Sequence, residues 1–111
     1  MKNIQSLRNH YYRCVTQENT LDHQFQHVYT TDLLSQAIKN MKDTDILITS
    51  LSHINVIGVM MMINSSIVII TEDKAVSQDM IKKANEENIC VLLTPYKSHE
   101  VIIDLYQRGF L

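Results

Sequence analysis

Threonines stand at the ends of three apolar segments in this 111-residue sequence, where their hydroxyl groups could bind an anion. Thr49, Thr71 and Thr94 each close a run of mostly β-branched residues, and they follow one another at intervals of 22 and 23 residues. If the runs are parallel strands, the threonines share one edge of a sheet, which is where ligands bind in open α/β folds. Backbone N–H groups at the starts of the following helices would favour a phosphate or a nucleotide. Threonine also ends strands in proteins that bind nothing there, so both alternatives stay open.

Polar residues at the start of an otherwise apolar helix are more specific candidates. Ser52, His53 and Asn55 stand immediately before the apolar segment 56–63. We therefore predict a ligand site for a small anionic or nucleotide effector from Thr49, Ser52, His53, Asn55, Thr71 and Thr94. The alternative is an enzyme or enzyme subunit acting on phosphorylated compounds, with His53 as general acid or base and Asp32 as its orienting carboxylate.

Several enzyme motifs are excluded by the residues that the sequence lacks. Gly58 and Gly109 are the only glycines, so neither the phosphate loop GxxxxGK[ST] nor the dinucleotide fingerprint GxGxxG can form. There is no GxSxG or HExxH motif, and Cys90 stands among apolar neighbours, where a thiol is expected to be inert. We therefore expect a protein that is not an enzyme and has no cofactor.

Two histidines have the spacing of a helical metal site. His23 and His27 are four residues apart, but residues 24–29 are typical of a loop that enters a strand. Positions four apart on a strand are separated by about 13 Å, which is too far for one metal ion. A site would also need a third ligand, for which Asp22 or His99 would be the candidates. We interpret the histidines as ordinary surface residues and predict no metal site.

The elements that must position these side chains follow from hydrophobic periodicity. Runs rich in β-branched residues, continuous rather than alternating, predict strands covered on both faces at residues 46–49, 67–71 and 89–94. Helical spacing lies between them, and connections of that length require parallel strands. The predicted fold class is α/β, with a mostly parallel β-sheet flanked by helices in a three-layer, Rossmann-like arrangement of repeated βα units.

Caps and apolar stripes predict the helix boundaries. Thr30 or Thr31 can cap a first helix, Asn88 can end a later one in the left-handed conformation, and Gly109 can stop the last, for which Ser98 is the predicted cap. The helices are predicted at residues 30–41, 53–63, 75–88 and 98–109. A short helix at residues 3–10 and a strand at residues 13–16 complete the prediction.

One predicted helix has no polar face. Residues 56–63 are apolar throughout, and such a surface exceeds what a monomer leaves exposed. We therefore predict a symmetric homodimer with flexible methionines at its interface. The predicted interface residues are Val59, Met60, Met61 and Met62.

Composition limits the class of protein and its partners. Hydrophobic residues at 45% and charged residues at 20% are near the averages of folded soluble domains, so the chain is not expected to be disordered. The length suits a single domain over residues 1–111. A formal net charge of -2 gives no attraction to nucleic acid or to anionic membranes, and neither is an expected partner.

The cysteines and the first residues suggest a compartment. Cys14 and Cys90 lie 76 positions apart, without metal or redox spacing, and are expected to be buried or half-buried thiols. The first twenty residues contain no apolar run of the kind found in signal peptides, and no apolar stretch approaches the roughly 20 residues of a membrane span. We expect a cytoplasmic protein.

The sequence resembles the small stand-alone DRTGG-domain proteins over nearly its whole length. The matching segments are 21–22, 29–35, 45–49, 52–56, 67–71, 84–89 and 105–109. In the name-giving motif only Asp22 remains where the family shows Asp-Arg, and Gln26-His27-Val28 replaces Thr-Gly-Gly. Properties that depend on those glycines are therefore not expected here.

The resemblance implies a function as well as a fold. It implies an accessory α/β domain, similar to the N-terminal domain of the HPr kinase/phosphorylase and found alone or beside kinase-like, phosphotransacetylase and CBS-containing pyrophosphatase domains. Catalysis then belongs to the neighbouring domain or to a partner enzyme, and self-association is typical. Regulation or scaffolding is the function that we expect, and Ser52-His53-Ile54-Asn55 is where the resemblance places a ligand site.

Overall fold

The computed structural model describes all residues, 1–111, as short strands and helices around one main sheet. In chain order the elements are β1 (Lys2–Asn3), α1 (Ile4–Leu7), β2 (Arg13–Cys14), the 3₁₀ helix η1 (Glu18–Asp22), β3 (Gln24–Phe25), β4 (His27–Thr30), α2 (Leu34–Asn40), β5 (Asp45–Thr49), α3 (Asn55–Ile63), β6 (Ile67–Ile70), α4 (Gln78–Glu86), β7 (Cys90–Leu93) and α5 (Ser98–Gln107). None of these helices combines the length and the hydropathy that crossing a bilayer would need.

The main sheet has five strands in the order β2-β7-β6-β5-β4. β4, β5, β6 and β7 are parallel, and their register places Leu47 beside Val68 and Val68 beside Val91. β2 is an antiparallel edge strand that pairs with β7, and β1 and β3 form a separate two-stranded sheet. The predicted α/β fold with a mostly parallel sheet is confirmed.

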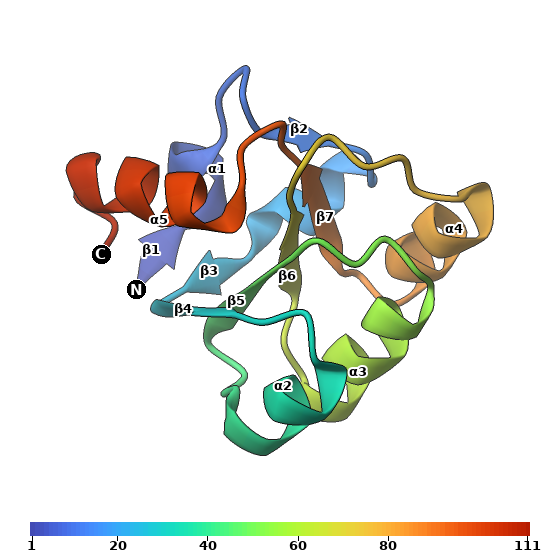
Figure 1. The fold of residues 1–111 in the computed structure, drawn as a ribbon. Coiled ribbons are helices and arrows are strands. Elements are labelled where there is room, and N and C mark those ends of the chain that lie inside the picture. The colour runs from blue at the N-terminus through green and yellow to red at the C-terminus, as the bar shows by residue number, and fades with distance from the viewer.

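Helices cover both faces of this sheet, which explains why its strands are continuously apolar. Leu47, Val68 and Val91 face a core shared with α2, α3 and α4. The alternate residues of the same strands, among them Ile48 and Leu92, face a second core with α1 and α5. Right-handed crossovers between neighbouring strands place α2, α3 and α4 on one side, and α5 passes to the other (Figure 1).

Two helices begin later than predicted because local hydrogen bonds hold the chain extended. Thr30 continues β4 and pairs with Ile48, while the hydroxyl of Thr31 accepts a hydrogen bond from the Leu33 N–H at 3.0 Å. The first long helix therefore starts at Leu34, and the predicted start at residue 30 or 31 is wrong. α4 starts at Gln78 rather than residue 75, because Ser77 is its N-cap and accepts from the Met80 N–H at 3.1 Å.

The predicted helix ends are more accurate. Asn88 has a φ of 54° and Gly109 a φ of 84°, so both adopt the left-handed conformation that ends a helix. α5 does begin at Ser98, but its N-cap is Lys97, whose N–H donates to the Glu100 side chain at 2.9 Å. The N-terminal helix and strand are present in shorter form, as Ile4–Leu7 and Arg13–Cys14.

The apolar helix α3 packs mostly inside its own chain. Val59 and Met60 are 7% and 0% exposed and belong to the core between α3 and the sheet. Met61 and Met62 are 38% and 68% exposed. Of the four predicted interface residues, Met61 and Met62 extend to the surface, whereas Met60 is fully enclosed and Val59 nearly so because α2 and α4 flank α3 on the same face of the sheet.

Candidate functional site

The carboxyl ends of the parallel strands form one edge of the sheet, and those of β6 and β7 lie toward the top of Figure 1. The backbones of the three threonines are neighbours there: the Thr71 N–H donates to the Thr49 carbonyl at 2.9 Å, and the Thr94 N–H donates to the Ile70 carbonyl at 3.0 Å. All three side chains are buried, with exposures of 1%, 0% and 1% for Thr49, Thr71 and Thr94. Ligand contact by these threonines stays a prediction, and it requires the loops above them to open.

Asp32 organises the β5 end of this edge. Its carboxylate accepts hydrogen bonds from the Thr49 hydroxyl at 2.9 Å and from the Ser50 N–H and hydroxyl, both at 2.7 Å. Partial burial disfavours the charged carboxylate, but these hydrogen bonds and the positive charge of Lys74 outweigh it and lower the pKa of Asp32. The charged side chain of Asp32 therefore links the loop after β4 to the loop after β5.

Replacing Asp32 by alanine is expected to lower the free energy of unfolding by about 1–3 kcal/mol, because the buried hydroxyl of Thr49 loses its acceptor. Asp32→Asn keeps the shape and should cost less at pH 7. Since the folded-state pKa is lowered, the ionised carboxylate stabilises the fold above the unfolded value of about 3.9, and this advantage over Asp32→Asn disappears as the pH falls through the folded pKa.

Urea titrations at pH 7 and pH 3 measure both effects. Asp43→Ala is the matched control, because Asp43 is an exposed carboxylate in the loop between α2 and β5, where its side chain makes no hydrogen bond. An equal loss of stability for Asp43→Ala and Asp32→Ala, or the same difference between wild type and Asp32→Asn at both pH values, contradicts the role given to Asp32.

The three polar residues around the start of α3 lie at the surface of the same end. His53 and Asn55 are exposed and Ser52 is partly buried. The His53 Nδ1 atom accepts a hydrogen bond from the Asn55 N–H at 3.1 Å, and this bond holds the ring beside the first residue of α3. Asp32 binds Thr49 and Ser50 instead of His53, so the acid–base pair that the enzyme alternative needs is not formed.

The chain diverges at this edge between β6 and β7. β6 leads to α4 on one face, whereas β7 leads to α5 on the other, and such a divergence is where open α/β sheets bind ligands. Here the backbone itself bridges the gap: the N–H groups of Glu72 and Asp73 donate to the carbonyls of Tyr96 and Thr94 at 2.9 and 3.0 Å. Glu72 and Asp73 have φ values of 67° and 56°, which are costly for residues with side chains.

A buried hydroxyl lies beneath this bridge. The Thr71 Oγ1 atom has no hydrogen-bond partner, although the residue is fully buried. An unsatisfied buried hydroxyl costs about 1–3 kcal/mol. Two left-handed residues and one unsatisfied hydroxyl at adjacent positions mark residues 71–73 as a strained loop at the β6 end of the edge.

The two histidines that have the spacing of a helical metal site do not belong to any group that could hold a metal ion. His23 is partly buried, and its Nε2 atom lies 2.6 Å from the Asn88 carbonyl, whereas His27 is an exposed residue at the start of β4. No group of three or more His, Cys, Asp or Glu side chains is close enough to hold a metal ion.

The two cysteines face the same core from neighbouring strands. Cys14 pairs with Leu92 across the β2–β7 ladder, so it is a diagonal neighbour of Cys90 on the same face. Cys14 is half-buried and Cys90 is buried, as predicted. Interaction with the neighbouring Cys90 thiol, with help from Thr16 and Thr20, outweighs burial and lowers the pKa of Cys14 to about 5. The same contact, together with burial, raises the pKa of Cys90.

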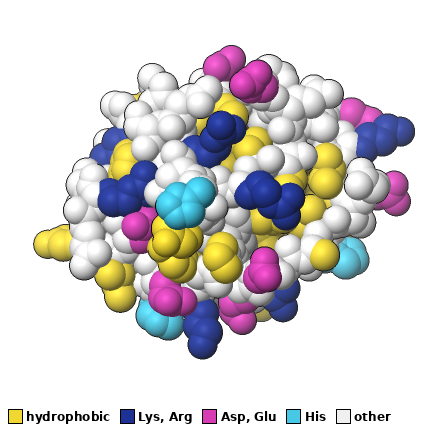
Figure 2. All heavy atoms as spheres, turned by 90° about the horizontal axis from the view of Figure 1, so that it is seen from above, with side chains coloured by type: hydrophobic (Ala, Val, Ile, Leu, Met, Phe, Trp, Pro, Cys, Tyr) yellow, Lys and Arg dark blue, Asp and Glu magenta, His cyan; other side chains and the backbone are white.

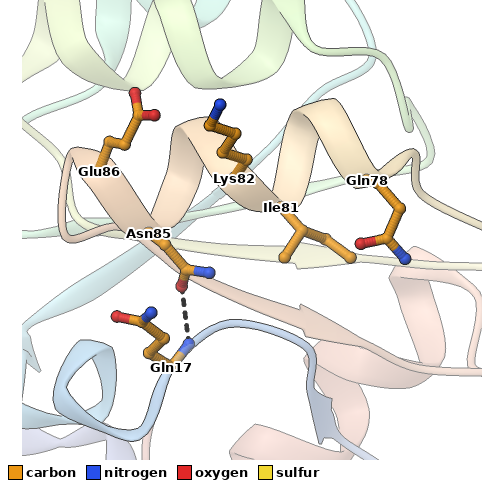
Figure 3. A pocket seen from close by; sticks show the side chains of 6 residues that line it. All are labelled: Gln17, Gln78, Ile81, Lys82, Asn85 and Glu86. Carbon is orange, nitrogen blue, oxygen red and sulfur yellow. Dashed lines mark hydrogen bonds between the residues drawn. The ribbon is translucent and has the colours of Figure 1, made fainter.

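Two hollows lie away from the predicted residues. One of about 430 Å³ runs along α4 beside Gln17, whose N–H donates to the Asn85 Oδ1 atom at 2.7 Å (Figure 3). Its lining is polar apart from Ile81. The other lies beside β2 and is lined by Arg8, Asn9, His10, Tyr12, Arg13 and Cys14. Sequence reasoning missed this second hollow, although basic and aromatic residues alternate closely in residues 8–13.

Comparison with known proteins identifies the family. The family model of the DRTGG domain matches residues 13–107. This chain belongs to the DRTGG-domain family. Residues 26–28, which replace Thr-Gly-Gly of the motif, contain no positive φ, so this DRTGG domain passes from β3 into β4 without glycine.

One solved structure is similar to this DRTGG domain in fold. It contains the CBS and DRTGG domains of the regulatory region of Clostridium perfringens pyrophosphatase, in complex with the activator diadenosine tetraphosphate. The TM-score is 0.60 at 21% sequence identity, and the match covers 68% of this chain and 33% of that one. This DRTGG domain therefore spans about a third of the chain that it matches. No curated protein matches it.

Proposed function

We propose that residues 1–111 form one non-catalytic DRTGG domain that binds a small anionic effector of the nucleotide class and acts as a homodimer. The observation that carries the proposal is the divergence of β6 and β7 at the carboxyl edge, in a family that also occurs in a nucleotide-activated regulatory region. The lack of a hydrogen bond between His53 and Asp32 favours binding without turnover. Similarity to the N-terminal domain of the HPr kinase/phosphorylase, and action on a partner enzyme, belong to the same proposal.

A thermal-shift screen with inorganic phosphate, ATP and diadenosine tetraphosphate tests effector binding. A ligand at 100 times its dissociation constant should add about 2.7 kcal/mol to the free energy of unfolding. Phosphorus NMR of the same mixtures should show every compound intact after hours. A compound that raises the melting temperature and is also converted to products would support the enzyme alternative. If no compound shifts the melting temperature, effector binding is contradicted.

The homodimer rests on the exposed side of α3. An apolar hollow of about 530 Å³ lies between α2, α3 and α4, and it is lined by Leu34, Ile54, Asn55, Gly58, Val59, Met62 and Lys83. Gly58 is exposed in the middle of this helix, and a Cβ atom there would meet nothing within 4 Å. Nothing inside the chain therefore requires glycine at position 58. A second copy of α3 that crosses this helix at Gly58 would require it, because only a residue without a side chain lets the two helices come close.

Gly58→Ala is expected to have opposite effects on the fold and on the dimer. Alanine in an exposed helix raises the stability of the chain by about 0.5–1 kcal/mol. The added methyl group should weaken self-association by at least about tenfold, because it separates the two helices. Sedimentation at tens of micromolar measures the dimer, and urea titration at low protein concentration measures the fold. A wild-type protein that sediments at 12.9 kDa contradicts the dimer.

A further inference from the structure

The hollow beside β2 gathers positive charge, and neither of its arginines is in an ion pair. It has a volume of about 550 Å³, and Arg8, His10 and Arg13 are exposed around it. The ion pairs of the chain join Lys83 with Glu87 and Arg108 with Asp104, so neither Arg8 nor Arg13 is in one. Two guanidinium groups and an imidazole around one hollow suit a group with more than one negative charge, because arginine binds phosphate in a bidentate manner.

Hydrogen bonds hold the backbone of this hollow in place. The Asn9 side chain accepts from the Tyr11 N–H at 2.9 Å, and the Asn9 carbonyl accepts from the Tyr12 N–H at 3.0 Å. Tyr12 is fully buried and its hydroxyl donates to Asp104 on α5 at 2.7 Å. Arg13 pairs with Leu93, the last residue of β7. The hollow is therefore a fixed part of the carboxyl edge rather than a mobile loop.

The Tyr11 ring lies next to the hollow: it does not line it, but it contacts the ring of His10, which does. Tyr11 is stacked on Tyr96 with ring centroids 5.0 Å apart and an angle of 21°, and the His10 ring lies 4.0 Å from Tyr11 on centroids. Tyr11 remains 41% exposed. Rings of this kind stack with nucleobases, and they do so for every base because each has a π-face.

The rest of the carboxyl edge is less suited to an anion. Asp32, Glu72 and Asp73 lie at the ends of the middle strands, with Lys74 as the nearby cation. Seen from above, this end of the molecule mixes acidic and basic side chains, and basic ones flank a histidine and hydrophobic side chains near its middle (Figure 2). Asp104, the acid nearest Tyr12, is neutralised by Arg108 at 3.1 Å. Charge therefore favours the β2–β7 end over the predicted residues near His53.

From this juxtaposition we infer that the effector of the proposed function binds at the β2–β7 end, with its phosphate chain between Arg8, His10 and Arg13 and its base against the Tyr11 ring. The inference rests on the proposed function and names its site. A nucleoside polyphosphate is the ligand class, because a phosphate chain matches the two guanidinium groups and a base matches the exposed ring. Cys14 lines the same hollow, so a bound ligand should also cover its thiol.

Isothermal titration of the full chain with ATP tests the charges. Arg8→Ala and Arg13→Ala should each weaken binding by about 10- to 100-fold, because each removes charge-assisted hydrogen bonds. Lys82→Ala removes an equal charge from the separate hollow of Figure 3 and should change nothing. His53→Ala should likewise retain binding, since it lies near the opposite part of the edge.

The base contact has its own test with tripolyphosphate, which carries the charge without a base. Tyr11→Ala should weaken ATP binding about tenfold and leave tripolyphosphate binding unchanged. ATP should also slow the alkylation of Cys14 by iodoacetamide. The dependence of this protection on ATP concentration should give the same dissociation constant as the titration.

The outcomes separate the inference from the function on which it rests. If wild type binds no nucleotide or polyphosphate, the proposed function is wrong. If wild type binds ATP but Arg8→Ala and Arg13→Ala bind equally well and Cys14 is not protected, the function survives and the location is wrong. Equal weakening of ATP and tripolyphosphate by Tyr11→Ala removes the base contact from the inference. Circular dichroism of each variant confirms that it is folded.

Discussion

Met60→Ala is expected to lower the free energy of unfolding by about 2–5 kcal/mol, the range for large-to-small changes at buried aliphatic positions. Met60 is fully buried on the inner side of α3, in the core that also contains Leu47 and Val68. Truncation removes contacts with the sheet and leaves a cavity that a close-packed core cannot close. Chemical denaturation below the concentration at which the protein self-associates measures the effect on the fold alone.

Met62→Ala, two residues away, provides the matched comparison. Met62 is 68% exposed, so its truncation should change the stability of the chain by less than about 0.5 kcal/mol. It should weaken self-association if α3 is the dimer interface. Ile103→Ala is a second control, because Ile103 is 52% exposed on α5, away from that helix. Similar losses of stability for Met60→Ala and Met62→Ala would refute the packing of α3 described here.

The second large effect is expected in thiol chemistry. Iodoacetamide should modify Cys14 at nearly the same rate at pH 6 and pH 8, because the lowered pKa of Cys14 keeps the thiolate populated over that range. An ordinary thiol, with a pKa of about 8.5, slows roughly 100-fold over the same interval. Cys90 should not react in the folded protein, since it is buried in the sheet and its pKa is raised. Peptide mapping after timed alkylation separates the two sites.

Two variants test the cause of this reactivity. Cys90→Ala removes the thiol beside Cys14 and should raise the pKa of Cys14, so that its alkylation becomes pH-dependent again. Cys90→Ser keeps a donor at that position and should preserve more of the wild-type profile. A steep loss of rate between pH 8 and pH 6 in the wild type would show that the two thiols do not interact in this way.

The strands were the most predictable part of the fold. A strand covered on both faces has no polar positions, so the runs at Ile46, Ile67 and Ile89 indicated both their extent and their place in the middle of a sheet. The lengths between them indicated parallel pairing. Helix starts were less predictable, because Thr30 could cap a helix or continue a strand and only pairing with Ile48 decides between these alternatives.

The candidate site also has a part that the sequence predicted and a part that it could not predict. Residues 49, 71 and 94 were correctly predicted to lie side by side, because the carboxyl ends of parallel strands share one edge. Their burial could not be predicted, since it depends on distant contacts: the loop at Glu72 and Asp73 binds the backbone at the end of β7, and Asp32 binds Thr49. The sequence did not indicate a site at residues 8–13, because their placement depends on the pairing of β2 with β7, which lies about 80 positions later.

The sequence by itself determined the three apolar strands of the sheet, their parallel direction and the resemblance to the family, because hydrophobic period and turn residues act over a few positions. Only the tertiary structure decided which side chains are accessible: it enclosed Met60 while exposing Met62, buried three threonines, bound Asp32 to Ser50, and gathered Arg8, Arg13 and Tyr96 at one corner. The reason is physical. Accessibility and charge environment depend on which distant segments pack together, and local patterning does not contain that information.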